Sequence, residues 1–198
     1  MPLEPPNKLD VQLNDLVSDW TGCSDCKLHR SRTYQVWWRH YGPQVNRRYS
    51  ILLVGEGPGE SEDLEGVPFV GRSGRLLDRL LEASNVTHAT ITNAVMCRPP
   101  GNRNPNRGEL KACWPRLQRL IKILEPKIIV PVGKVPATWL LDRDITARTL
   151  VKRVYDWRLG SFRAKIVPLY HPAFLLRQNS TQLENDMVAR LRMVRGMM

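Results

Sequence analysis

A chain of 198 residues, 42% of them hydrophobic, is long enough for one domain with a substantial core and too apolar to stay disordered. No apolar run reaches the roughly 18–20 residues that span a bilayer. The first residues, MPLEPPNKLD, lack the basic and apolar stretches of a secretory signal, so we expect no secreted, membrane or fibrous protein but a cytoplasmic one.

The first 50 residues combine one helix with a long irregular segment. Apolar residues at helical spacing predict a helix over residues 9–20. Residues 22–50 are polar, basic and rich in turn-forming residues, so we expect mostly irregular structure there, held by Cys23 and Cys26.

From residue 51 onward, short apolar strands alternate with helices. Strands are predicted at residues 51–55, 89–95, 127–133 and 164–170. Helices are predicted at residues 71–83, 108–124, 134–142 and 181–195. This alternation favours an α/β fold with a mostly parallel sheet covered by helices on both faces. No linker or repeat divides the chain, so we expect a single domain over residues 1–198, with an N-terminal segment 1–50 and an α/β core 51–198.

Positive charge is concentrated in two stretches. The chain has 30 Lys and Arg against 19 Asp and Glu, a net charge of +11. Residues 27–48 contain six Lys or Arg and no acid, and residues 98–122 contain seven against Glu109 alone. Aromatic residues are interleaved with both stretches, namely Trp37, Trp38, Tyr41 and Trp114. The pattern favours a nucleic acid over an acidic membrane, because neither stretch forms a long amphipathic helix. In the second stretch we expect Arg98, Arg103 and Arg107 to contact phosphates.

Four cysteines form an uneven pattern. Cys23 and Cys26 make a Cys-x2-Cys pair, and Cys97 and Cys113 are separated by fifteen residues. In a reducing compartment such a set indicates a metal site more than disulfides. The spacing suits zinc or an iron–sulfur cluster and does not choose between them.

Several polar residues follow predicted strand ends, where parallel sheets bind ligands. The loop Gly55-Glu56-Gly57-Pro58-Gly59 is not a nucleotide loop, because the Gly-x-Gly-x-x-Gly spacing fails at Glu60. Acidic residues crowd this part of a basic chain, namely Glu56, Glu60, Glu62, Asp63 and Glu65. Carboxylates repel DNA, so we expect at least one of them to serve the site.

Three further side chains each allow a structural and a functional interpretation. Asn93 either caps a turn or pairs with the edge of a nucleobase. Phe69 is either a core aromatic or a platform on which a base stacks. His171 is either structural or a donor to developing negative charge.

Taken together, these segments resemble a known family. GEGPGESED with PFVGRSG, ITNAVMCRPPGNRNP and YHPAFLLR, in that order and with the four cysteines, resemble the family 4 (iron–sulfur) uracil-DNA glycosylases of the uracil-DNA glycosylase superfamily. The resemblance covers roughly residues 20–178. It implies a three-layer α/β/α fold with a central four-stranded parallel sheet. It also implies a [4Fe–4S] cluster held by Cys23, Cys26, Cys97 and Cys113.

The resemblance also assigns roles by motif. The implied catalytic residues are Glu56, Asn102 and His171. The implied base-binding residues are Gly55, Gly57, Glu62, Phe69 and Asn93. The implied activity is that of a monofunctional DNA glycosylase, which flips uracil out of single- or double-stranded DNA and hydrolyses its N-glycosidic bond without a lyase step. We expect it to act as a monomer.

Other readings stay open at this point. They are a superfamily member that acts on other deaminated bases or captures abasic sites covalently, a non-catalytic iron–sulfur DNA-binding protein, and a zinc-binding DNA protein. Residues 34–48 and 143–163 do not match the family pattern. The superfamily's Gln-Asp-Pro-Tyr water-activating motif is absent, so the group that orients the water is undetermined.

Overall fold

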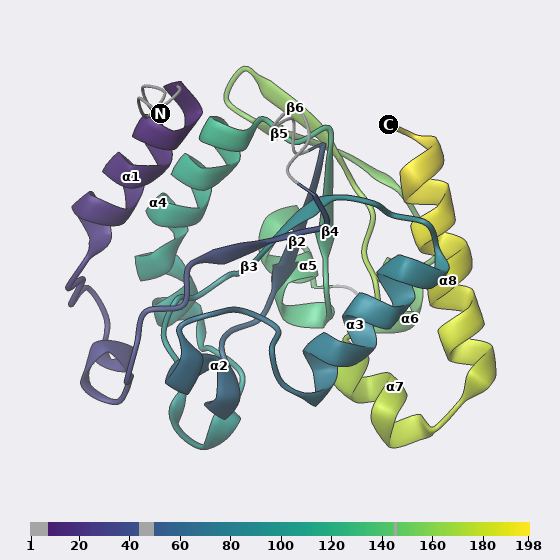
Figure 1. Cartoon of the computed structure of the whole chain (residues 1–198), viewed down its shortest axis with the longest axis horizontal. Coiled ribbons are helices and arrows are strands. Elements are labelled where there is room, and N and C mark those ends of the chain that lie inside the picture. Colours follow the sequence, from purple (N-terminus) through teal and green to yellow (C-terminus); the bar gives the residue numbers. More distant parts are fainter. Residues whose placement is uncertain (1–7, 44–49, 145) are drawn as a thin grey trace, which may run out of the picture.

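A computed structural model describes residues 8–43, 50–144 and 146–198 of the chain (Figure 1). The strands are β1 (Trp38–Tyr41), β2 (Ile51–Gly55), β3 (Ala89–Asn93), β4 (Ile128–Pro131), β5 (Tyr155–Leu159) and β6 (Phe162–Ile166). Within these residues they form one six-stranded mixed sheet in the order β1-β3-β2-β4-β6-β5. The four central strands pair in parallel, and β1 and β5 pair antiparallel at the two edges.

The predicted four-stranded parallel sheet is therefore incomplete: the sheet is six-stranded and mixed, because an antiparallel strand flanks the parallel ones on each side. β1 lies in the segment expected to be irregular, and its four residues are all half-buried, which leaves no apolar run as a signal. β5 forms a hairpin with β6 around Gly160, inside the unmatched segment 143–163. Its sequence alternates half-buried and exposed residues, the period of two that is typical of a strand.

The strand predicted at 164–170 is displaced: β6 begins at Phe162 and ends at Ile166, and beyond it only an isolated bridge joins Leu169 to Val132. Residues 44–48 of the unmatched segment 34–48 lie outside the described residues, as do residues 1–7 of the N-terminal segment.

The helices of the described residues confirm all five predicted ones and add three. They are α1 (Lys8–Trp20), α2 (Glu60–Glu65), α3 (Arg72–Ala83), α4 (Arg107–Leu124), α5 (Lys134–Leu141), α6 (Ala147–Leu150), α7 (Pro172–Gln178) and α8 (Thr181–Gly196). Short 3₁₀ turns occupy Lys27–Arg30 and Pro100–Asn102. α2, α6 and α7 were not predicted, and α4 continues through Pro115 as expected. No helix in the described part of the chain is long and apolar enough to cross a membrane.

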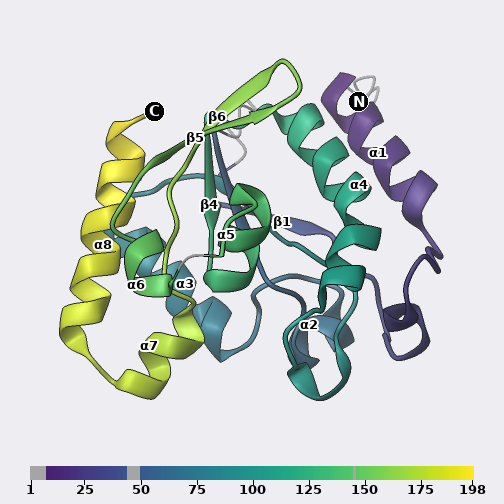
Figure 2. The same ribbon diagram turned by 180° about the vertical axis from the view of Figure 1, so that it is seen from behind.

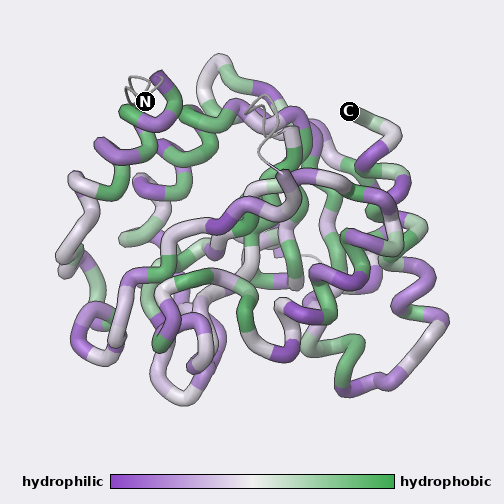
Figure 3. The backbone as a smooth tube through the Cα atoms, viewed as in Figure 1, coloured by the Kyte–Doolittle hydropathy of each residue, from purple (hydrophilic) through white to green (hydrophobic). Residues whose placement is uncertain are grey.

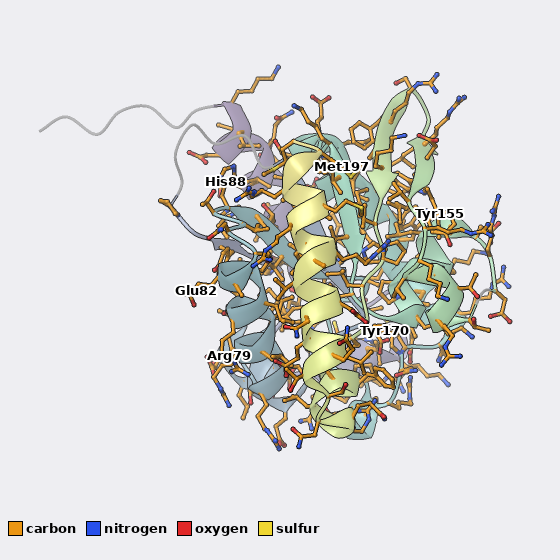
Figure 4. All side chains as sticks on the ribbon, turned by 90° about the vertical axis from the view of Figure 1, so that its right-hand side faces the viewer. Arg79, Glu82, His88, Tyr155, Tyr170 and Met197 are labelled. Carbon is orange, nitrogen blue, oxygen red and sulfur yellow. The ribbon has the colours of Figure 1, made fainter. Side chains whose placement is uncertain are left out.

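The helices cover both faces of the sheet, which gives three layers (Figures 1 and 2). Leu52 and Val54 of β2 pack in one cluster with α1, α4 and α5. Ile51 and Leu53, the alternate residues, pack in a second cluster with α3, α7 and α8. The apolar residues accordingly gather along the strands in Figure 3, and Figure 4 faces α8 with α3 beside it.

The carboxyl ends of the parallel strands meet at one edge of the sheet. α2 follows β2, α5 follows β4 and α7 follows β6, and both α2 and α7 lie in the lower part of Figure 1. The C-terminus lies on the opposite side. Ligands bind at this edge in parallel sheets, and the predicted site residues lie there.

Candidate active site

A cavity of about 500 Å³ opens at this edge. Its lining includes eight of the predicted site residues, namely Glu56, Gly57, Glu62, Phe69, Asn93, Asn102, Arg103 and His171. Gly55, Arg98 and Arg107 are not among the lining residues, and neither are the four cysteines. The structure thus brings the proposed base-binding and catalytic side chains together around one space, which we call the base pocket.

Phe69 is held in a backbone conformation that a bulky residue rarely adopts. Its φ is 57°, in the left-handed region, and its side chain is 93% buried. Arg39 of β1 donates to the carbonyls of Pro68 (2.9 Å) and Phe69 (3.4 Å). Gly74 permits this turn, because a Cβ there would lie 1.8 Å from the Phe69 carbonyl oxygen. Residues in such strained conformations cluster at functional sites.

Glu62 organises the loop between β2 and α3. Its carboxylate accepts the backbone N–H groups of Gly59 (3.0 Å), Val70 (3.0 Å) and Gly71 (2.8 Å). The first of these bonds caps α2, and the other two fix the segment that follows Phe69. With three donors satisfied, Glu62 lines the base pocket as a support for Phe69.

Asn93 lies at the end of β3 and is almost fully buried, with 2% of its surface exposed. Its backbone pairs with Gly55 of β2. Gly55 lies next to both Asn93 and Phe69: a Cβ there would lie 2.4 Å from Asn93 Oδ1 and 2.6 Å from the Phe69 ring. Gly55 thus acts by its lack of a side chain, which lets amide and ring approach each other.

His171 precedes α7 and caps its first turn. Its Nδ1 accepts the backbone N–H of Ala173 at 3.2 Å, so the ring proton is assigned to Nε2. Burial, with a smaller effect from the positive charge of Arg177, lowers the pKa of His171 to about 4. The ring is therefore neutral at pH 7 and has one N–H left to donate. The ring centroids of His171 and Phe69 are 6.2 Å apart.

Glu56 is the second carboxylate of the base pocket. Burial raises the pKa of Glu56, while a hydrogen bond from the Val135 backbone and the charge of Arg177 oppose this rise. A Cβ at Gly133 would lie 2.7 Å from Glu56 Oε1 and 3.2 Å from the His171 Cβ, so both side chains border Gly133. Glu56 is not tied into the loop as Glu62 is, and it retains lone pairs for a ligand.

The loop between Cys97 and α4 carries the predicted phosphate contacts. Arg98 donates to Asn102 Oδ1 (2.8 Å) and lies 3.4 Å from a Glu60 oxygen. Arg103 forms two hydrogen bonds with Glu109, at 2.8 and 2.6 Å.

Glu109 in turn caps α4 together with Asn106, so Arg103 belongs to the cap. Arg107 is exposed, and no ion pair joins it to another of the described residues.

The four cysteines are brought together at a separate place. None of the four forms a disulfide, and they line one small space with Arg32. Arg32 donates to Cys97 Sγ (3.3 Å) and to the Cys23 carbonyl (2.8 Å). Burial raises the pKa values of Cys23, Cys26 and Cys97, and Arg32 opposes the rise at Cys97. Among the described residues, no three His, Cys, Asp or Glu side chains are placed to hold a single metal ion.

Sequence reasoning missed several residues of the base pocket. Ser73 and Arg177 line it, and Arg39 supports it from β1. Arg177 stands in the motif YHPAFLLR, which was the available signal. Arg116, counted in the basic stretch 98–122, is fully buried and contributes nothing to a phosphate-binding surface.

Comparison with known proteins agrees with this geometry. Residues 42–195 match the profile of the Uracil DNA glycosylase superfamily. A type-4 uracil-DNA glycosylase of Thermotoga maritima is 39% identical over 176 residues, 87% of this chain and 88% of the relative. That of Archaeoglobus fulgidus is 36% identical over 171 residues, 83% of each chain. That of Saccharolobus solfataricus is 36% identical over 170 residues, 82% of this chain and 76% of the relative. The chain belongs to the uracil-DNA glycosylase superfamily and, within it, to the type-4 enzymes, which confirms the resemblance found in the motifs.

Proposed function

We propose that this protein is a DNA-repair glycosylase that removes uracil from DNA by hydrolysing its N-glycosidic bond. The observation that carries the proposal is that a buried amide, an aromatic residue with a strained backbone and a neutral histidine meet around one cavity. Asn93 reads the Watson–Crick edge of the flipped base, and Phe69 stacks on its face. The Asn93 amide donates to uracil O4 and accepts from N3–H, whereas cytosine presents these groups in reversed places.

The chemistry follows from the protonation states. As the bond breaks, negative charge builds on the uracil ring and positive charge on the sugar. The Nε2–H of neutral His171 donates a hydrogen bond to the uracil ring as this negative charge develops, and the histidine needs no change of protonation state to do so. Uracil leaves with the electron pair of the broken bond, and Glu56, with free lone pairs, accepts a proton from the water that adds to the sugar. Asn102 lines the opposite loop, where Arg98 orients its side chain.

The DNA substrate binds across this same edge of the protein, which acts as a monomer. The base must leave the stack, which costs a few kcal/mol and less in single strands. Exposed cations such as Arg107 contribute through the phosphates. No lysine is among the residues that line the base pocket, so we expect an abasic site as product and no strand cleavage.

The cysteine site fits an iron–sulfur cluster. Cys23, Cys26, Cys97 and Cys113 would hold it, and a four-iron cluster takes one cysteine at each iron, so its ligands need not converge on one point as those of a single ion do. Arg32 favours the thiolate form of Cys97, which such a ligand requires. When bound, the cluster supplies a covalent link between the N-terminal segment and the loop before α4.

The cluster is tested by its metal content. The purified protein should be brown with about four irons per chain, measured by elemental analysis. Cys97→Ser should lose iron and solubility together, because Cys97 is buried and anchors the loop between β3 and α4. Colourless, active protein with stoichiometric zinc would exclude the cluster.

The activity is tested with an end-labelled oligonucleotide that contains one uracil, beside the same strand with thymine. The uracil strand should break only after alkali, and the thymine strand should stay intact. Breakage without alkali would indicate a lyase, and a slowly migrating protein–DNA band would indicate covalent capture. An uncut uracil strand after alkali would refute the proposed activity.

A further inference from the structure

Arg116 of α4 is a fully buried arginine that lies behind the base pocket. Its exposed fraction is 0%. Its Nη2 donates to the backbone carbonyl of Asn93 at 2.6 Å and lies 3.5 Å from that of Ala94. Its Nη1 donates to Thr92 Oγ1 at 3.2 Å, and this hydroxyl donates to the Trp37 carbonyl at 2.6 Å. The guanidinium therefore holds the chain where β3 ends and Asn93 faces the cavity.

The buried charge of Arg116 has no carboxylate counter-ion in the part of the chain that the structure describes. Among the same residues, its Nε–H has no hydrogen-bond partner. Burying a charge without an opposite charge costs free energy. A neutral donor would satisfy the same carbonyl groups at a lower cost. The fold alone thus gives no reason for a cation at this position.

The reaction gives a reason. Negative charge develops on the uracil ring that Asn93 holds, and electrostatic effects are strong in a buried site because water does not screen them. A positive charge directly behind Asn93 polarises its peptide group and makes the potential on that side of the cavity more positive.

We propose that Arg116 is a positioning residue of the base pocket: its guanidinium fixes Asn93 and, through it, favours the negative charge on departing uracil. This inference rests on the proposed uracil excision. If Arg116 acts in this way and not only by packing, the rate lost when it is replaced should depend on how well the leaving base carries negative charge.

The test compares two leaving groups. 5-Fluorouracil carries negative charge more readily than uracil, because its fluorine withdraws electrons. Single-turnover excision of both bases from the same oligonucleotide is measured at saturating enzyme for Arg116→Met. The matched control is Arg119→Met, the same change one turn further along α4, where a partly exposed arginine pairs with Asp19.

Arg116→Met should slow uracil excision by about tenfold or more, less than the 10²–10³ of a donor that touches the charge. The loss on 5-fluorouracil should be at least about threefold smaller, because less stabilisation is needed. Arg119→Met should leave the ratio of the two rates unchanged. Equal losses on both bases, or no loss, would overturn the inference.

A second variant covers the case in which Arg116→Met does not fold. Arg116→Lys keeps the positive charge but loses the paired Nη1 and Nη2 donors of the guanidinium. Its rate of uracil excision should lie between those of wild type and Arg116→Met. If only the lysine variant folds, its rate should lie below that of wild type. In an Asn93→Ala background, Arg116→Lys should slow excision less than in wild type, because the positioned group is gone. An unchanged factor would count against the inference. A wild-type protein that releases no uracil refutes the proposed function itself, whereas an active wild type with insensitive variants refutes only the role of Arg116.

Discussion

The base pocket and the cysteine region (residues 23–32 with Cys97 and Cys113) are held together by different means. The base pocket is supported by the chain itself: Glu62 binds three backbone N–H groups, and Arg39 holds the turn at Phe69. Apart from Cys113 on α4, the cysteine region consists of a short 3₁₀ turn and loops, and Arg32 donates hydrogen bonds to Cys23 and Cys97 within it. The difference indicates that the sheet edge shapes the catalytic site, while the cysteine region depends on what its thiols bind.

The two regions are nevertheless joined. Both carboxylate oxygens of buried Asp63, on α2, lie 3.0 Å from the backbone nitrogen of Thr33, next to the cysteine region. α4 carries both Cys113 and Arg116, and Arg116 binds the backbone of Asn93. Despite these links, substitutions in the base pocket should mainly change the rate and those in the cysteine region should mainly change stability, because different contacts hold each region together.

The largest effect on rate is expected from His171→Ala. Loss of the Nε2–H donor should slow single-turnover excision by about 10²–10³. Affinity for uracil DNA, measured by titration of labelled oligonucleotide, should change only modestly, because His171 acts when charge develops. Since its pKa is about 4, the wild-type ring stays neutral between pH 8 and 6, and the rate should show no inflection near 6.5 from this residue.

The control for His171 is stability. A histidine buried in neutral form makes the free energy of unfolding fall as the pH drops from its ordinary pKa of 6.5 towards about 4, since the unfolded chain takes up the proton first. His171→Ala should lack this part of the pH dependence. A variant that lost rate only in proportion to its melting temperature would show a purely structural histidine.

A smaller effect is expected from Glu56. Burial raises the pKa of Glu56, so the wild-type rate should fall in acid at a pH above 4.5, the ordinary glutamate value, as the carboxylate takes up a proton. Glu56→Gln should lower the rate at pH 7.5 by roughly ten- to a hundredfold, within or below the usual range for a proton-transfer group. It should also remove the acid limb. A pH–rate profile of Glu56→Gln that keeps this limb would assign it to another group.

Most of the fold could be predicted from the sequence, because the buried strands and long helices have strong apolar periodicity. α1, α3, α4 and α8 and the strands β2, β3 and β4 are examples. The edge strands were missed, since half-buried residues give a weak pattern that depends on the neighbouring strand. The short helices α2 and α7 were missed as well. Their N-cap residues are Gly59 and His171, which are not part of the usual Ser/Thr capping pattern.

Those residues of the site that lie near the end of a predicted strand could be predicted from the sequence. Asn93 and His171 could be found because a parallel sheet gathers its carboxyl ends. Arg39 and Arg116 could not, because each acts on a backbone carbonyl distant in the sequence, and no local pattern records such a contact. The sequence also gave no means to tell Arg103 from Arg107, which the structure separates.

The smallest effect, and the sharpest comparison, concerns these two arginines. Arg107→Gln removes an exposed cation that forms no ion pair with any described residue, and it should reduce the slope of log affinity against log salt by about 0.9 on duplex DNA. The melting temperature should stay the same. Arg103→Gln removes the partner of buried Glu109 and weakens the cap of α4, so its melting temperature should fall. Salt titrations of both variants on uracil and thymine strands, with thermal unfolding alongside, separate the two roles. Arg107 belongs to the DNA-binding surface only if its variant loses affinity for both strands equally, since phosphate contacts carry no base information. The opposite outcome is that Arg103→Gln keeps full stability and reduces the salt slope by the same amount as Arg107→Gln. In that case Arg103 exchanges Glu109 for a DNA phosphate in the complex, and the loop before α4 binds DNA through both arginines.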